Sequence, residues 1–221
     1  MKKQCTIVIS GGMDSSTLAY YLKDKGYELE AVSFSYGQKH AVKELECAKK
    51  IANDLKIKHT VVDMSFLGSL LNSALTNKDE AVPEGHYEAE TMKRTIVPNR
   101  NTIMATIAHA IGYSKGIKNL ALGVHGGDHH IYFDCRPVFI DTLQTLLQRS
   151  NGDDEIKVFA PFLYIDKTDI LRLGLNLNVP YQDTWTCYAG RTDACGKCGS
   201  CSERIQSFQQ CNTKDPLEYE K

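Results

Sequence analysis

The sequence predicts a doubly wound α/β domain with a mostly parallel sheet, followed by a small metal-binding subdomain. Three observations predict this fold class. Short apolar, β-rich runs alternate with helical patterns along most of the 221 residues, a glycine turn follows the first run, and four of the eight cysteines lie close together near the C-terminus. Alternating strands and helices are typical of a parallel sheet that is covered on both faces. We expect the main domain at residues 1–183, the metal-binding subdomain at 184–211 and a tail at 212–221.

The N-terminal part alternates strands and helices at short intervals. We expect strands at residues 5–9, 29–34 and 59–63 and helices at residues 17–22 and 42–55. The strand segments are rich in apolar and β-branched residues, as buried parallel strands are. From residue 67 to 97 the pattern weakens, and Pro83 and Gly85 interrupt it. We therefore expect a short helix there, followed by a flexible loop that serves as a lid.

Regular patterning returns at Asn101. Ile103, Ile107 and Ile111 have helical spacing and predict the core stripe of a helix. We expect strands at residues 119–122 and 157–159 and helices at residues 139–147 and 166–173. Asp166 is the expected N-cap of the last of these helices. Residues 215–221 are expected to form a frayed tail.

The most informative motif directly follows the first strand and reads Ser10-Gly11-Gly12-Met13-Asp14-Ser15-Ser16. Two glycines let the backbone approach a phosphate, and the N–H groups and dipole of the following helix attract an anion. Three serine hydroxyls add further donors. The segment lacks a Walker-type lysine and a G-x-G-x-x-G pattern, which excludes a P-loop NTPase and a dinucleotide fingerprint. An ordinary strand-to-helix turn is the simpler alternative, but the position, the hydroxyls and the acidic residue favour anion binding.

The charge and the cysteines narrow the function further. The net charge is -1 with no basic tract, so no electrostatic footprint for nucleic acid is visible. The apolar runs are too short for a membrane span, and no signal peptide or lipidation motif is present, so we expect a cytoplasmic protein without a membrane partner. Cys187, Cys195, Cys198 and Cys201 have the spacing of a closed structural zinc site. An iron–sulfur cluster or a redox-active C-x-x-C remains an alternative.

Several segments together carry a resemblance to a known family. The S-G-G-x-D-S motif resembles the pyrophosphate loop of the PP-loop ATP pyrophosphatases, which have an adenine nucleotide α-hydrolase-like fold. Four further segments occur in order: YGQKH at residues 36–40, VPNRN at 97–101, DCRP at 134–137 and TWTCY at 184–188. With the cysteine cluster, this set resembles the 7-cyano-7-deazaguanine synthases of queuosine precursor biosynthesis. The resemblance extends from Ser10 to Cys201.

The resemblance implies a carbon–nitrogen ligase that uses ATP, Mg²⁺ and a structural Zn²⁺. It implies conversion of 7-carboxy-7-deazaguanine and ammonia to the nitrile through an adenylated acid and an adenylated amide, with release of AMP and pyrophosphate. It also implies a homodimer. On this template the phosphates are held by residues of the glycine turn, namely Ser10, Gly11, Gly12, Ser15 and Ser16. Asp14 orients the loop or holds Mg²⁺, Lys167 faces the same phosphates, and Ser33 and Phe34 meet the adenine.

For the base, the same template favours Asp128 and Asp134 as acceptors of its N–H groups. Arg136 is expected to pair with the substrate carboxylate. Further residues expected at this crevice are Arg100, Asn101, Gln38 and His40.

Some alternatives remain open at this level. Many family members carry an asparagine and a tyrosine–serine pair around Asp128, whereas this chain has His125, His129 and His130 there, and these residues could instead form a second metal site. The chemistry could attach the same acid to another amine. A tRNA-thiolating PP-loop enzyme and a zinc-ribbon nucleic-acid binder are the other candidates.

Overall fold

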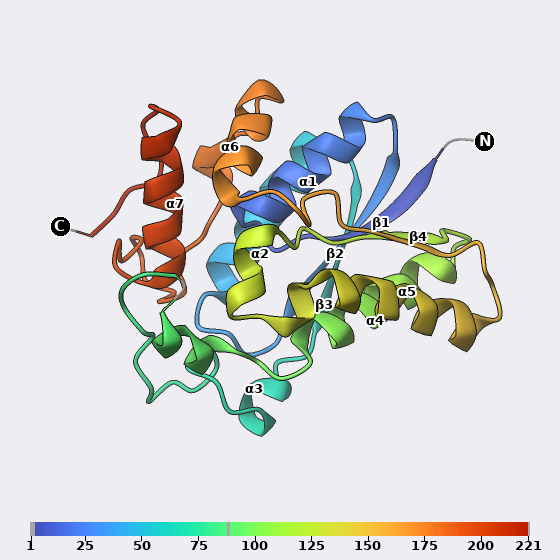
Figure 1. Cartoon of the computed structure of the whole chain (residues 1–221), viewed down its shortest axis with the longest axis horizontal. Helices are drawn as coiled ribbons and strands as arrows, with labels where there is room; N and C mark the ends of the chain where they lie inside the picture. Colours follow the sequence, from blue (N-terminus) through green and yellow to red (C-terminus); the bar gives the residue numbers. More distant parts are fainter. Residues whose placement is uncertain (1–2, 88, 221) are drawn as a thin grey trace.

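The protein is built around a parallel sheet, as a computed structural model shows for residues 3–87 and 89–220 (Figure 1). The strand order is β3-β2-β1-β4-β5, and all neighbouring pairs are parallel. The strands are β1 (Gln4–Val8), β2 (Glu28–Ser35), β3 (Lys58–Asp63), β4 (Asn119–Ala121) and β5 (Lys157–Phe159). The chain winds one way from β1 to β3 and then the other way from β1 to β5. This confirms the predicted fold class and places the switch in strand order between β1 and β4.

Helices cover both faces of the sheet (Figure 1). One face packs against α1 (Met13–Asp24), α2 (Ala41–Asp54) and α6 (Lys167–Asn176), and the other against α4 (Arg100–Tyr113) and α5 (Pro137–Asn151). Because side chains alternate along a strand, a central strand such as β2 supplies both cores. Ile7 and Ala31 lie in the first core, whereas Val32 and Phe34 lie in the second.

Local capping explains where two of these helices begin and end. The Asp166 side chain accepts a hydrogen bond from the Asp169 N–H at 2.8 Å, which confirms the predicted N-cap of α6. Helix α5 is longer than the predicted 139–147. It begins with Pro137, which lacks an N–H, and ends before Gly152, whose φ of 62° only glycine adopts easily.

The segment between β3 and α4 is packed rather than loose. It contains α3 (Leu67–Leu70) and a short 3₁₀ helix, η1 (Glu90–Thr95), and Leu75 and Met92 are completely buried in the core. Glu84 also forms an isolated β-bridge with Cys198. The prediction of a flexible loop is therefore wrong for the described residues, because a few well-placed apolar side chains anchor a segment that is polar on average.

The C-terminal helix α7 (Gly199–Gln210) packs against α6 and carries a completely buried arginine. Arg204 donates to the Thr184 hydroxyl at 2.8 Å, and its Nε and Nη2 donate to the Asp215 carboxylate at 2.8 and 2.9 Å. Tyr219 adds a β-bridge to Ala194. The frayed tail was a wrong prediction for the residues described up to 220, because a buried guanidinium needs a carboxylate partner.

Within the described residues, no helix combines the length and the apolar character needed to cross a membrane.

Candidate active site

A cavity lies at the carboxyl ends of β1, β2 and β4, next to the switch in strand order, where open α/β sheets bind ligands. It has about 1210 Å³ of space, including the part open to solvent. The loop after β1 and the end of β2 form one side. The start of α4, the residues after β4, Lys167 and the segment around Trp185 form the rest.

The glycine turn after β1 is a close-packed cradle. Gly11 has a φ of +80°, and a Cβ there would lie 2.4 Å from the Glu44 carbonyl oxygen, so this position requires glycine. Ser15 Oγ lies 3.1 Å from Ser10 Oγ and accepts the Ser10 N–H at 3.1 Å. The buried Ser16 hydroxyl has no hydrogen-bond partner among the described residues. A rigid loop with spare donors at the start of α1 fits a phosphate group.

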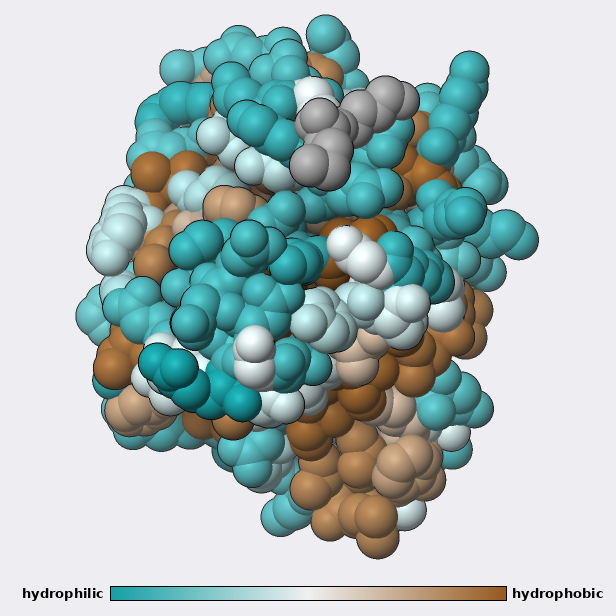
Figure 2. Space-filling model, turned by 90° about the vertical axis from the view of Figure 1, so that its right-hand side faces the viewer, coloured by the Kyte–Doolittle hydropathy of each residue, from teal (hydrophilic) through white to brown (hydrophobic). Residues whose placement is uncertain are grey.

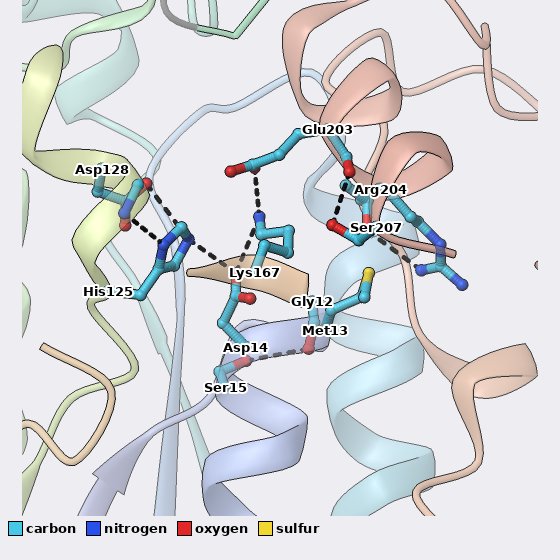
Figure 3. A network of polar contacts seen from close by, with 12 residues as sticks. Gly12, Met13, Asp14, Ser15, His125, Asp128, Lys167, Glu203, Arg204 and Ser207 are labelled. Atoms are coloured by element: carbon cyan, nitrogen blue, oxygen red, sulfur yellow. Dashed lines mark hydrogen bonds and ion pairs between the residues drawn. The ribbon is translucent and has the colours of Figure 1, made fainter. Parts of the chain in front are cut away.

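Charged side chains from three distant segments meet beside this loop (Figure 3). Lys167 Nζ lies 3.2 Å from Asp14 Oδ2 and 2.7 Å from Glu203 Oε2. Burial alone lowers the pKa of Lys167, but attraction to Asp14, Glu203 and Asp128 outweighs it and holds the pKa above its usual range. Lys167 is therefore a fixed cation beside the glycine turn.

A second set of contacts continues from Asp14 (Figure 3). His125 Nδ1 accepts the Gly127 N–H at 3.1 Å, so the proton of the neutral ring is on Nε2. That nitrogen lies 3.8 Å from Asp14 Oδ2 and 3.6 Å from Asp128 Oδ1. Asp128 also accepts the Tyr87 hydroxyl at 2.7 Å. Burial raises the pKa of Asp128, but attraction to His125 and Lys167 and the Tyr87 hydrogen bond lower it overall.

The opposite side of the cavity is aromatic. Arg100, at the start of α4, lies among the tyrosines Tyr36, Tyr132 and Tyr188. Its neighbour Asn101 is fixed from behind, since its backbone N–H donates to Asp134 Oδ2 at 3.2 Å. The cavity lining thus has a charged part and an aromatic part.

The structure brings most of the predicted site residues to this cavity. The residues that line it are Ser10, Gly12, Asp14, Ser15, Ser33, Phe34, His40, Arg100, Asn101, Asp128 and Lys167. Gly11, Ser16, Gln38, Asp134 and Arg136 are not among the lining residues.

Three of these residues have structural partners. Gln38 bonds the Tyr36 N–H and the Phe34 carbonyl, and Asp134 caps α4 through Asn101. Arg136 donates to the His129 carbonyl at 2.9 Å, and its guanidinium carbon lies 3.8 Å from the centre of the Phe133 ring.

The sequence prediction missed Glu203, Tyr87 and the pocket tyrosines. Tyr36 and Tyr188 belong to segments that carried the family resemblance, so a signal for them was present. Glu203 had no signal beyond its position two residues after Cys201.

The four clustered cysteines are buried, and their sulfur atoms lie within 4.8 Å of one another. The four thiols hydrogen-bond to one another, which lowers the pKa of Cys187 and Cys195 and raises that of Cys198 and Cys201. Zn–S bonds of about 2.3 Å place tetrahedral sulfurs roughly 3.8 Å apart, so one small ion fits this group. Across the part of the chain that the structure describes, no other group of His, Cys, Asp or Glu meets the same criterion. A second metal site at His125 is therefore not supported.

A family model described as "Queuosine biosynthesis protein QueC" matches residues 4–212. The chain belongs to the QueC family.

Relatives in this family match the chain along its length. The chain is 46% identical to a 7-cyano-7-deazaguanine synthase 1 from Colwellia psychrerythraea over 220 residues, covering 100% of both chains. It is 49% identical to a 7-cyano-7-deazaguanine synthase from Caldicellulosiruptor bescii over 217 residues, 98% of this chain and 97% of the relative. The fold is similar to that of an NMN synthetase from Francisella tularensis, with a TM-score of 0.54, 13% identity and coverage of 96% and 79%.

Proposed function

We propose that this chain makes 7-cyano-7-deazaguanine from 7-carboxy-7-deazaguanine and ammonia, at the cost of two ATP molecules. It is a carbon–nitrogen ligase of the QueC family. The observation that carries the proposal is that the phosphate cradle and the aromatic pocket open into one cavity, so that ATP and a planar acid can meet. The alternatives, transfer of the acid to another amine and thiolation of tRNA, are not favoured by the names of the relatives.

The reaction explains why such a cavity is needed. A carboxylate is a poor electrophile because its leaving group is oxide. Attack of its oxygen on the α-phosphate of ATP releases pyrophosphate and makes AMP the leaving group, which ammonia displaces to form the amide. The amide oxygen is adenylated in turn, and loss of AMP and a proton leaves the nitrile. The protein contributes orientation and charge stabilisation in both rounds.

The phosphate side is assigned to the glycine turn and its neighbours. Ser10, Gly11, Gly12, Ser15 and Ser16 hold the outer phosphates through N–H and hydroxyl groups, and Lys167 neutralises the charge of departing pyrophosphate. Ser33 and Phe34, at the end of β2, border the adenine. Asp14 has a buried carboxylate oxygen without a hydrogen-bond partner among the described residues, which suits it to hold Mg²⁺. When bound, Mg²⁺ screens the phosphate charges.

The base is assigned to the other side. Asp128 accepts N–H groups of the deazaguanine ring, and Asn101 and His40 border it. Asp134, Arg136 and Gln38 are not among the lining residues and are proposed to act on substrate binding by holding α4, the 126–136 turn and the end of β2 in place.

The cysteine cluster is proposed to hold Zn²⁺, with residues 184–211 as a subdomain pinned by the metal. In a four-iron iron–sulfur cluster each cysteine binds a different iron, so its thiolates lie further apart than around one ion, and we favour a single Zn²⁺ here. The Zn²⁺ supplies no chemistry at the cavity. Cys198 is the N-cap of α7 and Cys201 lies in its first turn, so the metal fixes the helix that presents Glu203 to Lys167.

We also infer a cytoplasmic homodimer without a nucleic-acid partner. An exposed apolar area occupies the lower part of the face shown in Figure 2, the end of the molecule where α3 lies. Phe66 and Leu70 there are 62% and 73% exposed. Light scattering on the protein and on Leu70→Glu tests the assembly, because a charge at the centre of the interface would yield monomers.

The function is tested by incubating the protein with the acid, ammonium, ATP and Mg²⁺ and identifying the products by mass. Nitrile, AMP and pyrophosphate are expected. Asp14→Ala should keep the fold and the bound metal but release no pyrophosphate. AMP formation that requires the acid but yields neither amide nor nitrile would contradict the proposal and indicate another acceptor.

A further inference from the structure

Two permanently charged cations line the described part of the cavity, Lys167 and Arg100. Their surroundings differ. Lys167 has carboxylate partners at 2.7 and 3.2 Å. No carboxylate among the described residues lies within ion-pair distance of Arg100, and a guanidinium cannot lose its proton in a protein. Within the described part of the chain, Arg100 is therefore a cation in the cavity without a carboxylate in direct contact, and Asp134 and Asp128 attract it from further away.

The position of Arg100 in its helix adds to this imbalance. It is the first residue of α4, where the helix dipole is positive and disfavours a cation. Its guanidinium carbon lies 6.0 Å from the centre of the Tyr132 ring, and Tyr36 also lies close to it. Neutral phenols can bond and stack on a guanidinium, but they do not cancel its charge. An anionic ligand bound next to Arg100 would neutralise this charge.

The two cations serve different parts of the cavity. Lys167 faces Asp14 in the phosphate cradle, whereas Arg100 faces the tyrosines. The Tyr87 ring connects the two sides, with its centre 5.7 Å from Lys167 Nζ and 6.2 Å from the centre of the Tyr132 ring. A ligand that reaches from the tyrosines toward the cradle therefore presents one end to each cation.

We propose that Arg100 binds the carboxylate of the acid substrate while Tyr36, Tyr132 and Tyr188 pack against its planar ring. This inference rests on the proposed function and names the residue that selects its first substrate. A guanidinium can bind a carboxylate through two parallel hydrogen bonds, and tyrosine rings pack favourably on a flat heteroaromatic ring. Arg136, the arginine that the sequence favoured for this role, is outside the cavity lining and bonded to a backbone carbonyl.

The two rounds of the reaction provide an internal control. The first round starts from the negatively charged acid, and the second starts from the neutral amide. Both rounds consume ATP at the same cradle. A residue that recognises the carboxylate affects the first round selectively, whereas a residue that binds ATP affects both rounds equally.

The test compares the wild type with Arg100→Lys, each supplied separately with the acid and with the synthetic amide. Lysine keeps the charge but loses the two-pronged geometry. We expect kcat/KM for the acid to fall about 10- to 100-fold, as for the loss of a hydrogen bond to a charged group, and kcat/KM for the amide to change less than about 3-fold. Turnover of the amide also shows that the variant is folded. Arg172→Lys, an exposed arginine on α6, is the matched control and should change neither rate.

Three results would overturn the inference. Equal losses with acid and amide would assign Arg100 to ATP. An acid-selective loss in Arg136→Lys but not in Arg100→Lys would assign the carboxylate to Arg136. Equal affinity of the wild type for acid and amide without ATP, measured by calorimetry, would exclude any carboxylate-binding cation and needs no variant. Failure of the wild type to form nitrile from either compound would instead refute the proposed function.

Discussion

Replacing Gly11 by alanine would insert a methyl group where the backbone of α2 already lies. The new Cβ would be 2.4 Å from the Glu44 carbonyl oxygen and 2.6 Å from the Ala48 nitrogen. Gly26 has almost the same φ, +79° against +80°, but nothing lies within 4 Å of its Cβ position. Gly26→Ala is therefore a control that carries the backbone strain without the overlap.

The expected difference follows from these two contributions. A left-handed non-glycine residue costs about 1–2 kcal/mol in both variants. The overlap at Gly11 adds about 1–3 kcal/mol, because α2 or the turn must move. The loss of unfolded-state entropy on replacing glycine is the same at both positions and cancels. Gly11→Ala should thus unfold about 1–3 kcal/mol more easily than Gly26→Ala.

Urea unfolding followed by circular dichroism measures this difference, and each kcal/mol corresponds to about 2–4 °C in Tm for a chain of this size. Pyrophosphate release should be lost in Gly11→Ala and kept in Gly26→Ala, since only the former distorts the cradle. Equal unfolding midpoints for the two variants would refute the reasoning, because they would show that α2 does not confine the turn.

Three further predictions concern the charged network and the cysteine cluster. Glu203→Gln removes a negative charge that holds Lys167 in place. It should lower the rate of pyrophosphate release about tenfold or more, while the metal content stays unchanged. An unaltered rate would show that Asp14 alone suffices to hold Lys167. Cys198→Ser should reduce both the Tm and the amount of bound metal, which mass spectrometry measures. Cys211→Ser, at the end of α7, is the control and should reduce neither. A Cys198 variant that is stable without metal would mean that the cluster is not structural. The pKa of Asp128 is lower in the folded protein than its ordinary value near 4, so the ionised carboxylate stabilises the fold above that ordinary value. This contribution is lost as the pH falls through the lower pKa of the folded state. Asp128→Asn should therefore flatten the decline of Tm with acid below about pH 4, and an unchanged slope would argue against this coupling.

Much of the fold was predictable because its signals are local. Most strands contain a short run of apolar or β-branched residues, and β5 was predicted with the observed bounds. The N-cap of α6 and the glycine turn after β1 depend on residues that are close in sequence. The failures were at segments held by distant partners. The C-terminal tail is ordered by Arg204, eleven residues before Asp215, and the 67–97 segment by contacts with the core and with Cys198.

The candidate site divides in the same way. The glycine turn and the four cysteines were predicted because each has a recognisable sequence pattern, and Lys167 was predicted from its matching position in the family. The choice between Arg100 and Arg136 was not predictable from the chain alone. Both are arginines that precede or begin a helix, and only the fold shows that one opens into the cavity and the other bonds to the His129 carbonyl.

By itself the sequence determined the fold class, the glycine turn, the cysteine cluster and the family, since hydrophobic periodicity and motif spacing are properties of neighbouring residues. The tertiary structure alone decided that Glu203 reaches Lys167, that His125 presents Nε2–H to two carboxylates, and that tyrosines from four segments surround one cavity. These arrangements bring together residues as far apart in the chain as Tyr36 and Tyr188. Their proximity depends on how the sheet and helices pack, so it cannot be predicted from patterns of neighbouring residues in the sequence.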